Sequence, residues 1–185
     1  MKQNVMIAPT AAVCTAAQLQ GAITIGNNCA VHPGASVRSP GGIIVMGERC
    51  LVEDGTILAN DTLNVMEIGS NNLFESGCEV RSHSVGNGNW FEPKSLALEG
   101  SIIGNNCIIG SGVVVAAGEL VPDNSILVAV QTPGGDMRRI VREQKDYFVK
   151  AHSTMIQKYV DIFSRGSKSI YALEKHHDMR ELSEQ

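Results

Sequence analysis

The chain has 185 residues, 43% hydrophobic and 18% charged, so it is long enough for one domain with a buried core and too short for two. Its formal net charge of −4 provides no basic surface for a nucleic-acid backbone. No apolar run approaches the roughly 18–20 residues of a membrane span. We therefore expect no nucleic-acid partner and no membrane insertion.

The N-terminus and the cysteines favour the cytoplasm. Met1-Lys2-Gln3-Asn4 leads directly into repeat sequence, without the positive region and apolar stretch of a secretory signal. The five cysteines are an odd number and form no Cys-x-x-Cys pair, so we interpret them as reduced thiols. Aromatic residues make up 4% of the chain beside 19 glycines, which predicts an interior of aliphatic side chains in small, regular layers.

Aliphatic residues recur every six positions over most of the chain. The register slips three times and then resumes, giving about nineteen six-residue units, or hexads, which is too many for chance. The four registers are Ile7, Val13, Leu19, Ile25, Val31 and Val37; Met46, Val52 and Leu58; Ile68, Phe74 and Val80; and Val85, Phe91, Ala97, Ile103, Ile109, Val115, Val121 and Leu127. Such spacing predicts short strands that stack on the equivalent strands of the next coil.

The residues between the aliphatic positions are typical of tight corners. Gly and Asn often follow the aliphatic residue, and both accept left-handed backbone angles. A small side chain comes four positions after it, and this position includes Cys29, Cys50, Cys78 and Cys107. We therefore predict that residues 1–132 form a parallel β-helix of about six to seven coils, at about three hexads per coil.

Two irregularities interrupt the pattern. Pro40-Gly41-Gly42 shifts the register near one corner, and residues 59–67 cannot be threaded as a hexad. We expect an excursion loop over 59–67.

The sixth position of each hexad should point outward. In the N-terminal coils it is Ala12, Gln18, Thr24, Ala30 and Ser36, which predicts a solvated face. Later it becomes apolar, and counting three hexads per coil places four of these residues in one stacked row: Leu73, Trp90, Ile108 and Ile126. An exposed apolar row should be covered. We expect it to dock a helix of this chain, and the alternative is that part of it binds a partner protein.

A C-terminal helix is predicted over residues 133–166. Asp136 suits the N-cap after Pro133-Gly134-Gly135, and Gly166 suits the end. Apolar residues lie between them at helical spacing: Ile140, Val141, Phe148, Ala151, Met155, Ile156, Tyr159, Ile162 and Phe163. We expect this helix to pack along the solenoid on the apolar row, followed by a polar tail over 167–185 with too little apolar content to pack firmly.

Histidines do not converge into a metal site in this sequence. A zinc site between subunits needs three ligands, usually His, and the predicted solenoid supplies only His32 and His83. In the present register, the two His positions of hexapeptide-type carbonic anhydrases fall at Ser76 and Arg81. We predict no catalytic residue, no cofactor and no metal.

Other reactive residue types have structural explanations. Four cysteines occupy the small corner position, and Cys14 alone lies elsewhere. Glu53, Glu75 and Glu92 follow the aliphatic position and are typical of a solvated face rather than of paired acid–base catalysis.

Several stretches resemble the dynactin subunit 6 family. They include Val31-His32-Pro33-Gly34-Ala35, the GIIVMGE run over 42–48, Ile68 to Glu75 with Gly77-Cys78, and Val121-Pro122-Asp123-Asn124. The run from Asn71 to Cys78 is the most specific of these. Hexapeptide proteins as a group are left-handed, so the resemblance implies a left-handed parallel β-helix.

The resemblance also implies a function. It implies a non-enzymatic structural or adaptor subunit of the dynactin pointed-end complex, which supports dynein-driven, microtubule-based transport and cargo attachment in the cytoplasm and on the cytoskeleton. Its implied partners are the related hexapeptide subunit, dynactin subunit 5, and other pointed-end subunits including the actin-related protein, with dynein bound indirectly. The exposed edge strands and the 59–67 loop are candidate contacts.

Enzymes with the same repeat form the alternative. A hexapeptide-repeat acyltransferase or a divergent γ-class carbonic anhydrase-like enzyme would build its site between identical subunits. A homotrimer that holds stoichiometric zinc would favour that alternative, whereas a monomer that co-purifies with another hexapeptide protein would favour the adaptor.

Overall fold

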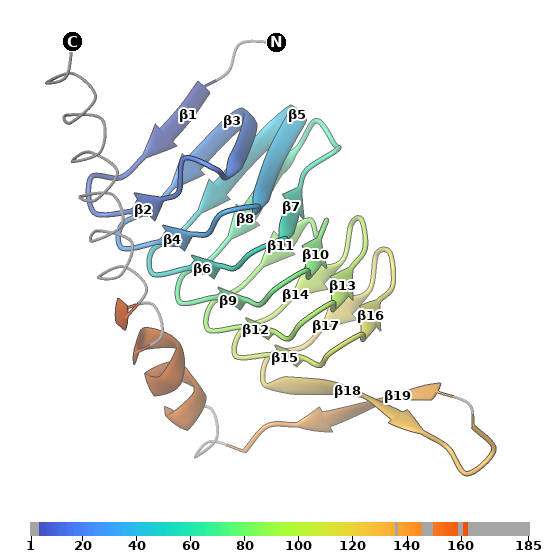
Figure 1. The fold of residues 1–185 in the computed structure, drawn as a ribbon. Coiled ribbons are helices and arrows are strands. Elements are labelled where there is room, and N and C mark those ends of the chain that lie inside the picture. The colour runs from blue at the N-terminus through green and yellow to red at the C-terminus, as the bar shows by residue number, and fades with distance from the viewer. Residues whose placement is uncertain (1–3, 136, 146–149, 159–160, 163–185) are drawn as a thin grey trace, which may run out of the picture.

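Parallel strands stacked coil on coil form a solenoid with three faces (Figure 1). The computed structural model describes residues 4–135, 137–145, 150–158 and 161–162. Backbone hydrogen bonds run between coils, as when the Ala30 N–H donates to the Cys50 carbonyl at 2.9 Å. The parallel β-helix expected from the six-residue spacing is confirmed.

Face 1 and face 3 belong to one 11-stranded sheet, because two long strands bend from one face to the other. Face 1 consists of β1 (Asn4–Ile7), the second halves of β3 (Gln18–Ile25) and β5 (Ser36–Met46), β8 (Val65–Ile68), β11 (Ser84–Val85), β14 (Ile102–Ile103) and β17 (Leu120–Val121). Face 3 consists of the first halves of β3 and β5, β7 (Ile57–Ala59), β10 (Glu79–Val80), β13 (Leu96–Ala97) and β16 (Val114–Val115).

Face 2 is a separate sheet of eight strands. Its parallel strands are β2 (Ala12–Val13), β4 (Ala30–Val31), β6 (Leu51–Val52), β9 (Leu73–Phe74), β12 (Trp90–Phe91), β15 (Ile108–Ile109) and β18 (Ser125–Gln131). The last strand, β19 (Met137–Glu143), pairs antiparallel with β18.

The core is a column of inward-facing aliphatic side chains, with the stacked rings of Phe74 and Phe91 5.0 Å apart. Every residue predicted to face inward from Ile25 to Leu127 is at most 3% exposed. The four registers read from the sequence are therefore correct, and each slip between them is absorbed at a corner or in a loop.

The corner between face 1 and face 2 depends on close contact between coils. Five glycines stack there, and a Cβ atom at any of them would meet a backbone or side-chain atom of the next coil within 3 Å: Gly26, Gly47, Gly69, Gly86 and Gly104. Asn28 and Asn106, two residues further along, both have φ of 55°. The buried Cys29, Cys50 and Cys107 occupy the same corner, so the predicted packing role of these cysteines agrees with the structure.

The predicted register shift at Pro40-Gly41-Gly42 is confirmed, whereas the excursion loop is shorter than predicted. Pro40-Gly41-Gly42 lies inside β5, where it forms a three-residue insertion relative to β3, and the register shifts between Gly21 and Ala22. The excursion loop spans 60–64, shorter than the predicted 59–67. Val65 and Met66 pair with Ile43 and Ile44, because these long strands extend face 1 toward the loop.

The prediction of a helix over 133–166 is wrong in its first part, because Met137–Glu143 is strand β19. A turn over 132–135, closed by the Gly135 N–H to the Thr132 carbonyl at 2.9 Å, returns the chain along β18. Pairing there satisfies the open backbone edge of β18, which a helix would leave unpaired. Arg139 fixes β19 further, since its guanidinium donates to both carboxylate oxygens of Glu119.

Helix is present over residues 150–158 and at 161–162. The predicted helix end at Gly166 and the polar tail over 167–185 lie outside the described residues.

The glycine stack generates a testable prediction. In Gly86→Ala the new Cβ would lie 2.5 Å from the Gly104 carbonyl oxygen, and the coils must separate locally to make room for it. We expect the free energy of unfolding to fall by about 2 kcal/mol or more, measured by chemical denaturation.

Gly134→Ala is the matched control, because the nearest atom to its Cβ would be 3.9 Å away. It should change the free energy of unfolding by less than about 0.5 kcal/mol. Equal effects of the two substitutions would contradict this account of the corner.

Candidate protein interaction site

The outward row of face 2 follows the register predicted from the sequence. Trp90 pairs with Leu73 on one side and Ile108 on the other, and Ile108 pairs with Ile126. Leu73 is buried, whereas Trp90, Ile108 and Ile126 are half-buried.

The helix over 150–158 packs on Leu73 and Trp90 of this row and on outward residues of the preceding coils. Ile156 is fully buried and forms a cluster with Ala30, Leu51 and Leu73, against which Trp90 packs. The prediction of a solvated face at Ala30 is wrong, because Ala30 is fully buried. Leu51 was missed, although it precedes the inward Val52 and so holds the same outward position as Leu73.

His152, one turn before Ile156, is buried against Trp90, with 5.3 Å between the two ring centroids. Within the described residues its Nε2 atom has no hydrogen-bond partner. Burial lowers the pKa of His152 to about 4. The imidazole is therefore neutral near pH 7, and its protonation would place an unpaired charge under the helix.

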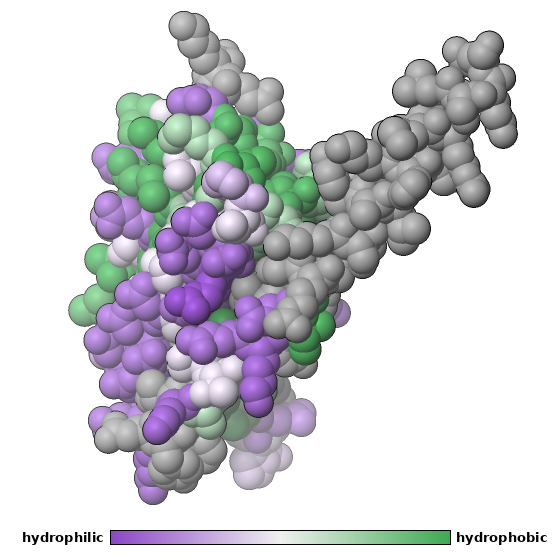
Figure 2. All heavy atoms as spheres, turned by 90° about the vertical axis from the view of Figure 1, so that its left-hand side faces the viewer, coloured by the Kyte–Doolittle hydropathy of each residue, from purple (hydrophilic) through white to green (hydrophobic). Residues whose placement is uncertain are grey.

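Face 1 carries exposed apolar side chains on its N-terminal coils. Met6, Ile43, Val45 and Val65 are each at least 40% exposed, and strand pairing brings them together through the intervening Ala22 and Thr24. We call these four residues the N-terminal patch. In Figure 2 hydrophobic side chains gather at the N-terminal end of the solenoid, at the top of the view. An exposed apolar surface of this kind is typical of a protein-binding site.

The 60–64 loop extends this surface. Leu63 is 87% exposed, and the Ile43 N–H donates to the Asn64 carbonyl beside it. The Asn60 side chain holds the loop from inside, because its amide donates to the carbonyls of Ile43 and Asn64. The loop is thus fixed in place while its most apolar residue faces solvent.

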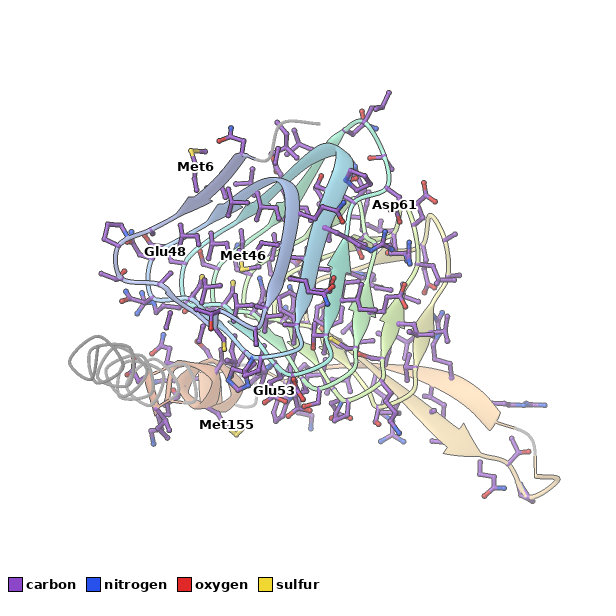
Figure 3. The ribbon with its side chains drawn as sticks, turned by 45° about the horizontal axis from the view of Figure 1, so that its top comes forward. Met6, Met46, Glu48, Glu53, Asp61 and Met155 are labelled. Atoms are coloured by element: carbon purple, nitrogen blue, oxygen red, sulfur yellow. The ribbon has the colours of Figure 1, made fainter. Side chains whose placement is uncertain are left out.

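Charged residues on face 3 anchor the same loop. Asp61 accepts from Arg38 at 2.9 Å and also from Arg81, which in turn pairs with Glu79. Figure 3 looks down on the N-terminal coils, with Met6 on β1 and Asp61 on the loop near β5. The ion pairs are partly exposed, so each contributes little alone, but together they join the coils of β5 and β10 to the loop between them.

The candidate metal-binding residues do not converge. His32 lies half-buried at a corner, where burial lowers its pKa, and His83 is exposed elsewhere in the repeat. Ser76 binds the Glu53 carboxylate through its N–H and hydroxyl, and Arg81 forms the ion pairs described above. Among the described residues, no three His, Cys, Asp or Glu side chains are grouped as a metal would require.

The thiols and carboxylates have structural roles. Burial raises the pKa of Cys78 to about 12 and that of Cys107 to about 11, so both remain protonated near pH 7. Glu53 and Glu92 accept hydrogen bonds from the backbone N–H groups of Ser76 and Ser111 in the next coil. Within the described residues, no helix is long and apolar enough to cross a membrane.

The chain matches one family of repeat proteins and is also similar, along most of its length, to individual known proteins. Residues 82–117 match the family described as bacterial transferase hexapeptide (six repeats). The chain is 32% identical over 153 residues to Dynactin subunit 6 of Xenopus tropicalis, covering 77% of this chain and 74% of that protein. It is also 30% identical over 162 residues to Dynactin subunit 6 of Dictyostelium discoideum, covering 85% of each.

Enzymes with the same repeat are also similar to this chain. Carbonic anhydrase of Methanosarcina thermophila is 28% identical over 149 residues, covering 67% of this chain and 60% of the enzyme. The crystal structure of a hexapeptide transferase family protein from Anaplasma phagocytophilum superposes with a TM-score of 0.71 at 17% identity, covering 89% of this chain and 92% of that one. At that identity the superposition supports the fold alone.

Docking of the helix should depend on Ile156. Ile156→Ala removes a fully buried side chain and should weaken docking by about 2–4 kcal/mol, whereas Ile162→Ala alters a residue that is 66% exposed and should change it by less than about 0.5 kcal/mol. Hydrogen–deuterium exchange over 150–158 measures the difference. Equally fast exchange in the two variants would show that Ile156 does not hold the helix.

Helix docking should also weaken in acid. The pKa of His152 is about 4 when docked and near 6.5 when free, so the free state binds the proton more tightly. The free energy of docking therefore has its full value above pH 6.5. It falls by roughly 3 kcal/mol in total as the pH decreases toward 4. Fluorescence of Trp90, the only tryptophan, reports the change between pH 7.5 and 4.5.

His152→Phe is the control for this titration. It keeps an aromatic ring against Trp90 but carries no titratable group, so its fluorescence should change much less over the same range. Any change that remains would come from Glu75 beside Trp90, because burial raises the pKa of that carboxyl. Superimposable titrations of the two proteins would exclude His152 as the cause.

Proposed function

This chain belongs to the dynactin subunit 6 family, and from that premise we propose that it is a non-enzymatic structural and adaptor subunit of dynactin. The single observation that carries the proposal is the similarity to proteins of that name along most of the chain. As part of the pointed-end complex, it would support dynein-driven transport along microtubules in the cytoplasm. Its direct partners would be dynactin subunit 5 and other pointed-end subunits, including the actin-related protein.

The surfaces of the solenoid support a role in protein binding. The N-terminal patch and Leu63 form an exposed apolar area beside a loop held by side-chain hydrogen bonds and ion pairs. A rigid apolar surface loses little conformational entropy on binding, which favours association.

The outward row of face 2 has a different role in this proposal. Leu73, Trp90, Ile108 and Ile126 serve as the docking surface for the helix of the same chain. Burial of Ile156 against Leu73 supports this assignment over partner binding. The partner surfaces are then those that the helix leaves uncovered.

The similarity to a carbonic anhydrase favours a second candidate function. A γ-class carbonic anhydrase-like or acyltransferase activity would need ligands or a nucleophile contributed between identical subunits. At the two positions expected for His ligands, Ser76 and Arg81 instead bind Glu53 and Asp61. These contacts support the adaptor over the enzyme.

Co-expression with dynactin subunit 5 tests the proposal. We expect a stable complex of the two chains on size-exclusion chromatography, without stoichiometric zinc by elemental analysis. Purification as a homotrimer that contains zinc and hydrates carbon dioxide would contradict it and support the enzyme.

A further inference from the structure

The two ends of the solenoid differ in how far their backbone and core are covered. At the C-terminal end β19 pairs with β18, and Arg139 donates to the Val114 carbonyl of β16. The inward side chains of the last coil, Val115, Val121 and Leu127, are at most 2% exposed. This end is therefore covered.

The N-terminal end has inward-facing side chains that remain accessible. Ile7 holds the position of Ile25 in the next coil, yet Ile7 is 45% exposed and Ile25 is 1% exposed. Val13 likewise pairs with Val31 and is only half-buried, as are Ala11 and Ala17. Apolar side chains that point into the core of a solenoid normally have a coil or a polar cap above them.

The backbone at this end is also open. In the second coil, the carbonyls of Ile25, Cys29, Val31 and Ala35 accept N–H groups of the first coil at 2.8–2.9 Å. The equivalent carbonyls of the first coil are those of Ile7, Ala11, Val13 and Ala17. Over the described part of the chain, β1 and β2 pair only with β3 and β4 of the second coil, so no backbone donor lies on the outer side of these four carbonyls. They form the template on which one more coil would hydrogen-bond.

We propose that the N-terminal end of the solenoid is a stacking site for the end coil of a second β-solenoid protein. The partner strands would donate N–H groups to the open carbonyls and place apolar side chains over Ile7 and Val13. The choice of a different β-solenoid chain as occupant rests on the function proposed above. No charged side chain occurs from Asn4 to Gly26, so a partner coil meets no unpaired charge there.

The area of the end determines how far the contact must extend. A coil of about 18 residues at about 3.3 Å each encloses a triangle roughly 20 Å on a side, whose area is about 170 Å². A stable interface needs about 800 Å² per partner. The contact must therefore continue onto the N-terminal patch, which adjoins the end at β1 because Met6 and Ile7 are consecutive.

Three lysine substitutions, each made in the whole chain, test the stacking site. The quantity measured is the dissociation constant of the complex with dynactin subunit 5. Ile7→Lys places a charge on the end, and Val45→Lys places one on the patch, where the side chain points away from the core. Leu120→Lys is the control, because Leu120 is 65% exposed on face 1 at the opposite end. We expect the dissociation constant to rise at least tenfold for the first two and less than twofold for the third.

Hydrogen–deuterium exchange of the unmodified proteins provides a second readout that does not depend on the folding of Ile7→Lys. Amides over residues 4–19 should exchange more slowly in the complex than in the free chain. Equal exchange in the free chain and in the complex would overturn the proposal, because it would show that the partner does not cover this end. Dimerisation of the isolated chain through this end would also overturn it, since the occupant would be a second copy.

The outcomes separate this inference from the proposed function. If the unmodified chains form no complex, the proposed function fails and this inference fails with it. If a complex forms and Ile7→Lys binds as tightly as Leu120→Lys, only the stacking site is wrong.

Discussion

Coil-to-coil stacking at the spacing of a β-sheet is the constraint on which this structure depends. Equivalent residues of successive coils lie about 4.8 Å apart, so each must fit directly on the residue above and below it. Gly86 and Gly104 meet so closely at one corner that a single Cβ atom would collide with backbone. The inward column has the opposite requirement, because only large aliphatic or aromatic side chains such as Phe74 and Phe91 fill the space between three faces. The six-residue pattern is the consequence of satisfying both conditions in every coil.

A structure that repeats in one dimension satisfies its own backbone and core everywhere except at its ends and outer faces. Three of those surfaces are covered, in whole or in part, by other residues of this chain. β19 covers the edge of β18, the helix covers Ala30, Leu51 and Leu73 on face 2, and ion pairs around Asp61 occupy part of face 3. The N-terminal end and the patch beside it are left open over the described residues. Because the open surfaces are contiguous, one partner would cover both in the proposed complex.

The sequence predicted what depends on the repeat and missed what depends on tertiary contacts. The inward registers and the stacking of Leu73, Trp90 and Ile108 follow from counting, because each coil has a nearly constant length. β19 was taken for helix because Ile140 and Val141 fit an apolar helical stripe equally well, and only the unpaired edge of β18 decides between them. Ala30 was assigned to solvent because nothing local to Ala30 indicates that Ile156, more than a hundred residues later, covers it. The loop at 60–64 was placed correctly but made too long, since pairing of Val65 with Ile43 is also a long-range contact.

The interaction site illustrates how one scaffold supports catalysis in some proteins and binding in others. A hexapeptide solenoid presents a regular array of outward positions, and their chemistry is set by side chains rather than by the fold. Arg81, at one of the two positions where the sequence register predicted the His residues of an anhydrase, pairs with Asp61 and Glu79. Those contacts fix the 60–64 loop and so hold Leu63 in solvent beside the N-terminal patch. Arg81 thus stabilises the loop beside an exposed apolar surface, and removing such a surface from water is favourable, which is the physical basis of the protein-binding role proposed above.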